Sequence, residues 1–162
     1  MDVADLAGQD LGYSEWMEIT QEQVDRFAAA TGDHQWIHVD RERAEASRFG
    51  ATIAQGFLVL SLTSRVLAQV LRVPGAEAVI NYRCDWVRFL SPVPVGCQLR
   101  ARVRVRTVEP VRGGVRLSLG LTFLVKGRRA PVCIGRIAVH AYPDGWAAGP
   151  PPRRDEARGP LS

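Results

Sequence analysis

The sequence predicts an α+β protein in which a meandering sheet wraps around one central helix. An apolar segment from about Gln55 to Leu71 has hydrophobic residues on nearly every side of a helix, and a helix that is apolar all round is expected to be buried all round. From Ala76 onward, apolar and polar residues alternate instead over long stretches, which is typical of strands. One apolar helix followed by consecutive strands favours a sheet packed around that helix.

The N-terminal part is expected to contain a short strand and then a helix. The strand is predicted around Tyr13 to Glu18. Thr20 and Gln23 have the spacing of a capping box, so the helix should begin at Gln21. Gly32 stands where a left-handed residue would end this helix.

A short connection follows this first helix. Asp40 is a good N-cap residue for a second helix over Arg41 to Ser47, so Asp33 through Val39 is predicted to be a loop between two helices. Loops of this kind often carry functional residues.

Four strands are predicted in the second half of the chain. Arg112-Gly-Gly114 is a strong hairpin signal between two of them. The domain is expected to span residues 1–146, and the Pro-rich residues 147–162 lack apolar periodicity and are predicted to be a disordered tail. The predicted strands are Ala76 to Trp86, Gln98 to Val108, Val115 to Val125 and Val132 to Tyr142.

Composition excludes several classes of protein. The chain has 162 residues, 46% of them hydrophobic and 23% charged, which is typical of one soluble globular domain. Its N-terminus carries acids where a secretory signal would be basic, and polar residues interrupt the apolar segment, so neither export nor a membrane span is expected. Three cysteines without CxxC spacing argue against disulfides and a zinc site. We therefore expect a cytoplasmic protein without a metal.

The net charge of +4 is consistent with an anionic partner, either nucleic acid or a phosphorylated carrier such as coenzyme A, and charge alone does not choose between them. Alternate residues from Arg100 to Arg106 are arginines, which places four guanidinium groups on one face of a strand. A solvated outer face is the simplest interpretation, and contact with a phosphate is the alternative. Aromatic interleaving is missing, so no nucleic-acid partner is expected.

Asp33 and His38 are the strongest candidates for chemistry. They lie five residues apart on the predicted loop, so a folded-back turn can direct both side chains at one small molecule. A carboxylate and an imidazole can together activate water without a metal. The alternative is that Asp33 only satisfies backbone donors after the helix and that His38 only packs, and spacing alone favours this alternative.

Three segments carry a resemblance to a known family. Thr31-Gly-Asp-His-Gln-Trp-Ile-His-Val-Asp40, then the segment from Phe49 to Leu58, then the segment from Val87 to Gly96 resemble the MaoC-like, or (R)-specific enoyl-CoA hydratase, family. The family hallmark is Gly-Asp-x-Asn-Pro-hydrophobic-His. Gln35 and Trp36 replace its Asn-Pro, and Gln55 stands where many members have histidine, as in the NodN-like branch.

The resemblance implies a hotdog fold, in which a curved antiparallel sheet wraps one long helix, and a homodimer. It also implies hydration of trans-2-enoyl thioesters to (R)-3-hydroxyacyl thioesters, or the reverse dehydration. Asp33 and His38 would be catalytic, and the backbone N–H of Gly56 at the helix start would bind the carbonyl oxygen. Gln55 and Phe57 would contact the substrate.

No cofactor is implied, since the substrate is itself carried on coenzyme A or acyl carrier protein. Two other functions remain open for the same fold. One is a hotdog thioesterase that hydrolyses the same class of substrate. The other is a non-catalytic protein that binds acyl thioesters.

Overall fold

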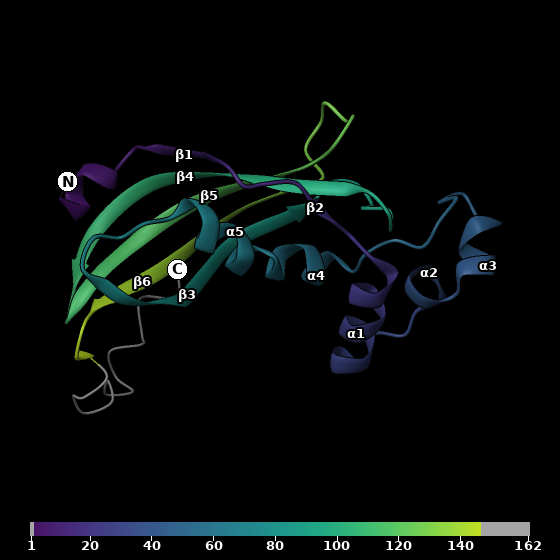
Figure 1. The fold of residues 1–162 in the computed structure, drawn as a ribbon, viewed down its shortest axis with the longest axis horizontal. Helices are drawn as coiled ribbons and strands as arrows, with labels where there is room; N and C mark the ends of the chain where they lie inside the picture. The colour runs from purple at the N-terminus through teal and green to yellow at the C-terminus, as the bar shows by residue number, and fades with distance from the viewer. Residues whose placement is uncertain (1, 147–162) are drawn as a thin grey trace.

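A six-stranded antiparallel sheet forms the body of the molecule (Figure 1). The structure is a computed structural model and describes residues 2–146, so the predicted tail over residues 147–162 lies outside the described residues. The strand order is β1-β4-β5-β6-β3, and β2 also pairs with β4. The strands are β1 Asp10–Tyr13, β2 Met17–Glu18, β3 Ala76–Phe89, β4 Gln98–Val111, β5 Gly114–Val125 and β6 Cys133–Pro143.

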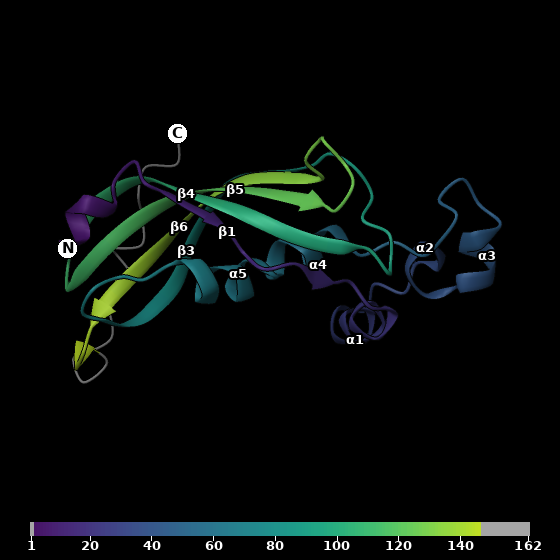
Figure 2. The same cartoon turned by 45° about the horizontal axis from the view of Figure 1, so that its top comes forward.

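The helices fall into two groups. Helices α4 and α5 lie along one side of the sheet, whereas α1, α2 and α3 lie together beyond one end of it (Figures 1 and 2). A 3-10 turn, η1, precedes the first strand. The bounds are η1 Val3–Leu6, α1 Gln21–Thr31, α2 Trp36–Val39, α3 Arg41–Glu45, α4 Gly56–Ser61 and α5 Thr63–Val70.

The alternation predicted for the strands decides which face of the sheet meets the helices. From Leu99 to Val105 on β4 and from Leu117 to Val125 on β5, every second residue belongs to the buried hydrophobic cluster, and the side chains between them face the other way. Burial of one such Val or Leu side chain contributes roughly 1.5 to 3 kcal/mol. The inward residues are Leu99, Ala101, Val103 and Val105 on β4, and Leu117, Leu119, Leu121, Phe123 and Val125 on β5.

The central helix departs from its prediction in two ways. It is divided at Leu62, although the backbone stays right-handed there and the hydrogen bond from Val66 N to Leu62 O, 3.0 Å long, carries the helix across the joint. It is also not buried all round, so that expectation was wrong. The sheet covers only one side of it, and the opposite side exposes Phe57, Ser61, Ser64, Arg65 and Ala68.

The strand predicted around Tyr13 to Glu18 is also wrong in its bounds, because the structure forms two short strands, β1 and β2, on either side of Ser14. The Ser14 hydroxyl accepts a hydrogen bond from Ala101 N (3.1 Å), so a side chain takes the donor that a continuous backbone ladder would use.

Strand β3 forms an edge of the sheet. Among the described residues it pairs only with β6, and its other side carries no neighbouring strand. Four of its apolar side chains, Val79, Ile80, Trp86 and Phe89, are 42–45% exposed. Between β4 and β5, Gly113 has a φ of +78°, as the predicted tight hairpin requires. None of the described helices is long and apolar enough to cross a membrane.

Candidate active site

Local signals place Asp33 immediately after the end of α1. The predicted capping box is present, since Thr20 Oγ1 accepts from Gln23 N and the Gln23 side chain accepts from Thr20 N. Gly32 ends the helix in the left-handed region with a φ of +78°, and its N–H donates to Ala28 O (2.8 Å). The chain therefore turns sharply at Gly32 and presents Asp33 at the end of the helix.

His38 lies on α2, a helical turn where an irregular loop was predicted. Gln35 is the N-cap of this turn and Trp36 is its first residue, which are the positions that the Asn and Pro of the family hallmark would occupy. Asn is a strong capping residue and Pro is favoured at the first helical position. The helical turn forms without either residue. Trp36 packs against Phe49, with 6.4 Å between ring centroids, and lies beneath the guanidinium group of Arg43, so packing holds the turn in place.

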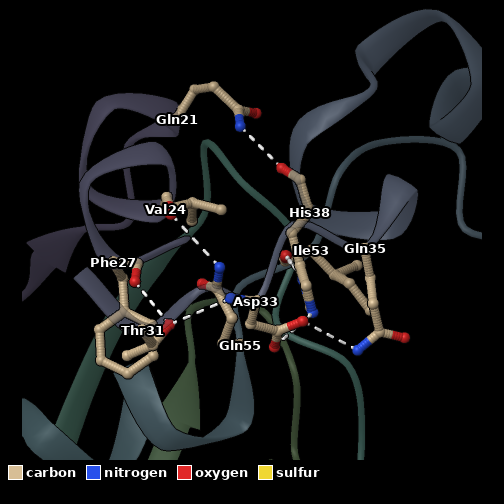
Figure 3. A network of polar contacts seen from close by, with 9 residues as sticks. All are labelled: Gln21, Val24, Phe27, Thr31, Asp33, Gln35, His38, Ile53 and Gln55. Atoms are coloured by element: carbon tan, nitrogen blue, oxygen red, sulfur yellow. Dashed lines mark hydrogen bonds and ion pairs between the residues drawn. The ribbon is translucent and has the colours of Figure 1, made fainter. Parts of the chain in front are cut away.

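The imidazole of His38 is held in one orientation (Figure 3). The residue is 5% exposed, and its Nδ1 lies 2.7 Å from Ile53 O. A carbonyl oxygen can only accept a hydrogen bond, so Nδ1 carries the proton and Nε2 of the neutral ring is an acceptor. Gln21 Nε2 also donates to His38 O (2.8 Å), which fixes the backbone beneath the ring.

Asp33 completes the pair. Its Oδ1 accepts a hydrogen bond from Gln35 Nε2 (3.0 Å), and its Oδ2 lies 3.6 Å from His38 Nε2. That separation is too long for a direct hydrogen bond. Two acceptors at this distance can instead share one water molecule, which donates a proton to each and keeps a lone pair free.

A cavity of about 290 Å³ adjoins this pair, between the start of α4 and the end of β3. His38 and Gly56 both line it, and Ile53, Val59, Phe89 and Val132 contribute apolar walls. Gly56 has no side chain between its backbone and the cavity, and a Cβ built there would lie 3.1 Å from the Phe89 ring. Asp33 does not line the cavity but lies beside His38, which does.

The two other predicted site residues lie next to the cavity without lining it. Gln55 is 2% exposed and donates through Nε2 to Val24 O (3.3 Å), while its Oε1 is buried and has no partner among the described residues. Phe57 is 67% exposed, and its ring packs edge-on against Phe89 with 5.8 Å between centroids.

Sequence reasoning missed two glutamines that orient the pair. Gln35 was noted only as a departure from the hallmark, yet it makes no side-chain cap and its amide binds Asp33 instead. Gln21 was noted only as the first residue of α1, yet it is buried, contacts His38 O and accepts from Thr52 Oγ1. No sequence pattern links residue 21 to residue 38, because only the fold brings them together.

Replacing Gln35 with Met, which has a similar size but no donor, is expected to lower the kcat of a reaction that depends on Asp33 by about tenfold, the usual effect of losing a hydrogen bond to a charged group. The melting temperature should stay unchanged because Gln35 is exposed and does not cap α2. His34→Ala, on the same loop, is the control and should keep full activity. A Gln35→Met enzyme as fast as wild type would contradict the positioning role.

Cys133 lines the cavity and is 1% exposed. Burial raises the pKa of its thiol to about 11, so only about one thiol in a thousand is ionised at pH 8. We expect iodoacetamide at that pH to leave Cys133 unmodified in the native protein and to alkylate it in guanidinium chloride, as measured by peptide mass spectrometry. Equal labelling rates in both states would show that this wall of the cavity opens.

The family model described as "MaoC like domain" matches residues 2–121, and the chain belongs to this family. It is 47% identical over 139 residues to 3-hydroxyacyl-thioester dehydratase Z of Mycobacterium tuberculosis, covering 85% of this chain and 92% of that protein. It is 48% identical over 103 residues to nodulation protein N of Rhizobium leguminosarum, covering 62% of this chain and 64% of that protein.

The structure is similar to the R-hydratase PhaJ1 from Pseudomonas aeruginosa, with a TM-score of 0.71, 26% identity and coverage of 94% of each chain. The family resemblance expected from the motifs is thereby confirmed, and so is the hotdog fold. The likeness to nodulation protein N accords with the replacements at Gln35 and Trp36.

Proposed function

We propose that this protein hydrates trans-2-enoyl thioesters to (R)-3-hydroxyacyl thioesters and catalyses the reverse dehydration. One observation carries the proposal: two acceptors, Asp33 Oδ2 and His38 Nε2, lie 3.6 Å apart beside a largely apolar cavity. Relatives named 3-hydroxyacyl-thioester dehydratase and 3-hydroxybutyryl-CoA dehydratase support the same reaction class.

Asp33 and His38 hold the reacting water between them. The water donates one hydrogen bond to each, and its free lone pair attacks the β-carbon of the enoyl thioester. As the new C–O bond forms, Asp33 accepts a proton and the π electrons move to the carbonyl oxygen. The enolate then collapses, the α-carbon takes up the proton from Asp33, and one water has been added across the double bond. General acid–base catalysis of this kind contributes about two to four orders of magnitude.

The backbone N–H of Gly56 binds the carbonyl oxygen on which negative charge develops. The first N–H groups of a helix have no partner within it, and the helix dipole favours negative charge at this end. Gly56 opens α4 and lines the same cavity as His38, so a thioester carbonyl at Gly56 puts its β-carbon near the water. One such donor stabilises the transition state by about 3 to 4 kcal/mol.

Gln55 and Phe57 are the proposed substrate contacts. Gln55 is the N-cap of α4 and directly precedes Gly56, so its backbone lies beside the proposed site of the carbonyl oxygen. The exposed ring of Phe57 packs against Phe89, which lines the cavity, so Phe57 can cover the acyl-carrying arm at the entrance.

Crotonyl-CoA distinguishes this function from the two alternatives. Loss of the enoyl absorbance without release of free thiol is expected. Release of free thiol would instead identify a thioesterase. A protein that binds acyl-CoA but shows neither loss of enoyl absorbance nor release of thiol, whatever the chain length, would be a non-catalytic binding protein. Relatives named 3-hydroxyacyl-thioester dehydratase and 3-hydroxybutyryl-CoA dehydratase favour hydration over the two alternatives.

The protein is proposed to act in the cytoplasm, without a cofactor, on a substrate carried by coenzyme A or acyl carrier protein. We also propose a homodimer in which the backbone edge of β3 pairs with its copy, because the open edge of a sheet is normally covered. Multi-angle light scattering should give twice the chain mass, and a monomer at micromolar concentration would contradict the dimer.

A further inference from the structure

A second cavity, of about 300 Å³, lies on the face of the sheet turned away from the helices. Its lining side chains belong to the outward-facing set of β4, since Val103 and Val105 between them are fully buried. Figure 2 shows α4 and α5 on the other side of the sheet. This cavity is therefore separate from the Asp33 and His38 site. The residues that matter here are Arg104, Arg106, Gly120, Arg136 and Trp86.

Strand register brings these residues into one row across the sheet. Arg104 on β4 pairs with Gly120 on β5, Gly120 pairs with Arg136 on β6, and Arg136 pairs with Trp86 on β3. Adjacent strands are about 4.8 Å apart, so the two arginines flank the glycine at a backbone separation of about 10 Å. Arg106 leans over the same glycine, because its Nε lies 3.2 Å from where a Gly120 Cβ would be.

The charges around Gly120 are not balanced. Of the arginines that line the cavity, Arg102 forms an ion pair with Asp10, whereas Arg104, Arg106 and Arg136 form none within the described chain. Like charges held on neighbouring strands repel one another. An anion above Gly120 would offset this repulsion, and arginine matches the geometry of phosphate through paired N–H donors.

Trp86 supplies an aromatic surface at the end of the row. It is 42% exposed and lines the cavity. Three guanidinium groups beside an exposed indole suit a ligand that joins phosphate groups to a flat ring, since bases stack on aromatic side chains. We propose that this cavity binds a nucleoside diphosphate, with its phosphates over Gly120 between Arg104, Arg106 and Arg136 and its base against Trp86.

The test is calorimetric titration of the whole protein with ADP at low ionic strength. Binding is expected, weakening as salt rises. Arg104→Ala and Arg136→Ala should each weaken it by about tenfold, and Gly120→Val should abolish it by filling the space over the row. Arg26→Ala, which removes an exposed charge from α1, should bind like wild type. No binding at millimolar ADP, or unchanged binding by the three cavity variants, would overturn the proposal.

Two further experiments test the contribution of the base and the source of the nucleotide. Pyrophosphate should bind more weakly than ADP, and Trp86→Ala should reduce the affinity for ADP to that for pyrophosphate. Equal affinities for ADP and pyrophosphate in the wild type would overturn the role of the base.

If the ligand is the nucleotide of acyl-CoA, Arg136→Ala should raise the KM for crotonyl-CoA but not the KM for crotonyl-pantetheine. If the ligand is a free nucleotide, neither KM should change. This arm alone rests on the proposed function, because ADP binding requires no turnover.

Discussion

Asp33→Asn is expected to lower kcat for hydration of crotonyl-CoA by about two to four orders of magnitude, the usual contribution of a general base. The amide keeps the shape of the carboxylate but cannot accept the proton that the water must lose. The melting temperature should change little, because Asp33 is partly exposed and its structural contacts are few. Initial rates from the enoyl absorbance, with thermal unfolding followed by circular dichroism, measure both quantities.

Asp40→Asn is the matched control for this variant. Asp40 lies on the same stretch of chain and caps α3 by accepting from Arg43 N (3.0 Å), and asparagine caps helices equally well. The same chemical change should therefore leave activity near that of the wild type. An Asp33→Asn enzyme that keeps more than a tenth of the wild-type kcat would remove Asp33 from the mechanism.

His38→Asn is expected to lower kcat by at least about two orders of magnitude, because it removes Nε2 from the water. The asparagine amide can still donate to Ile53 O in the place of Nδ1, so the buried carbonyl keeps its partner. His38→Ala removes both groups and should also destabilise the protein by about 1 to 3 kcal/mol through the unpaired carbonyl. Urea unfolding of the two variants separates the catalytic effect from the structural one.

The double variant Asp33→Asn with His38→Asn tests whether the two residues act on the same water. Two residues that act on one water are not expected to have additive effects, so the double variant should be about as slow as the slower single variant. Multiplied effects would mean that the two side chains act at separate steps. A His38→Asn enzyme with wild-type kcat would show that His38 only packs, which is the alternative that spacing alone favoured.

The sequence alone determined the features that depend on neighbours along the chain. The capping box at Thr20 and the left-handed Gly32 are local signals, so the ends of α1 and the place of Asp33 were predicted correctly. Alternation along β4 likewise separates the buried valines from the outward arginines, because successive side chains of a strand face opposite ways. The family motif predicted Asp33, His38 and Gly56 as one set, and the variants above test that prediction.

Only the tertiary structure decided what depends on which segments meet. The apolar segment after Gln55 predicted burial on all sides, but burial depends on the partners that surround a helix, and the sheet covers one side. The orientation of His38 depends on Ile53 and Gln21, each more than ten residues away. Hydrogen bonds of this kind form between side chains and distant backbone, and they leave no periodic signal in the sequence.

The row across the outer face shows the same division. The alternation of Arg104 and Arg106 was visible in the sequence, and a solvated face was its simplest interpretation. The register that sets Gly120 between Arg104 and Arg136 depends on how three strands pair. A shift of one residue would turn every side chain of a strand to the other face. The sequence therefore determined that β4 is basic. Strand pairing decided that its arginines surround Gly120, which has no side chain to fill the space between them.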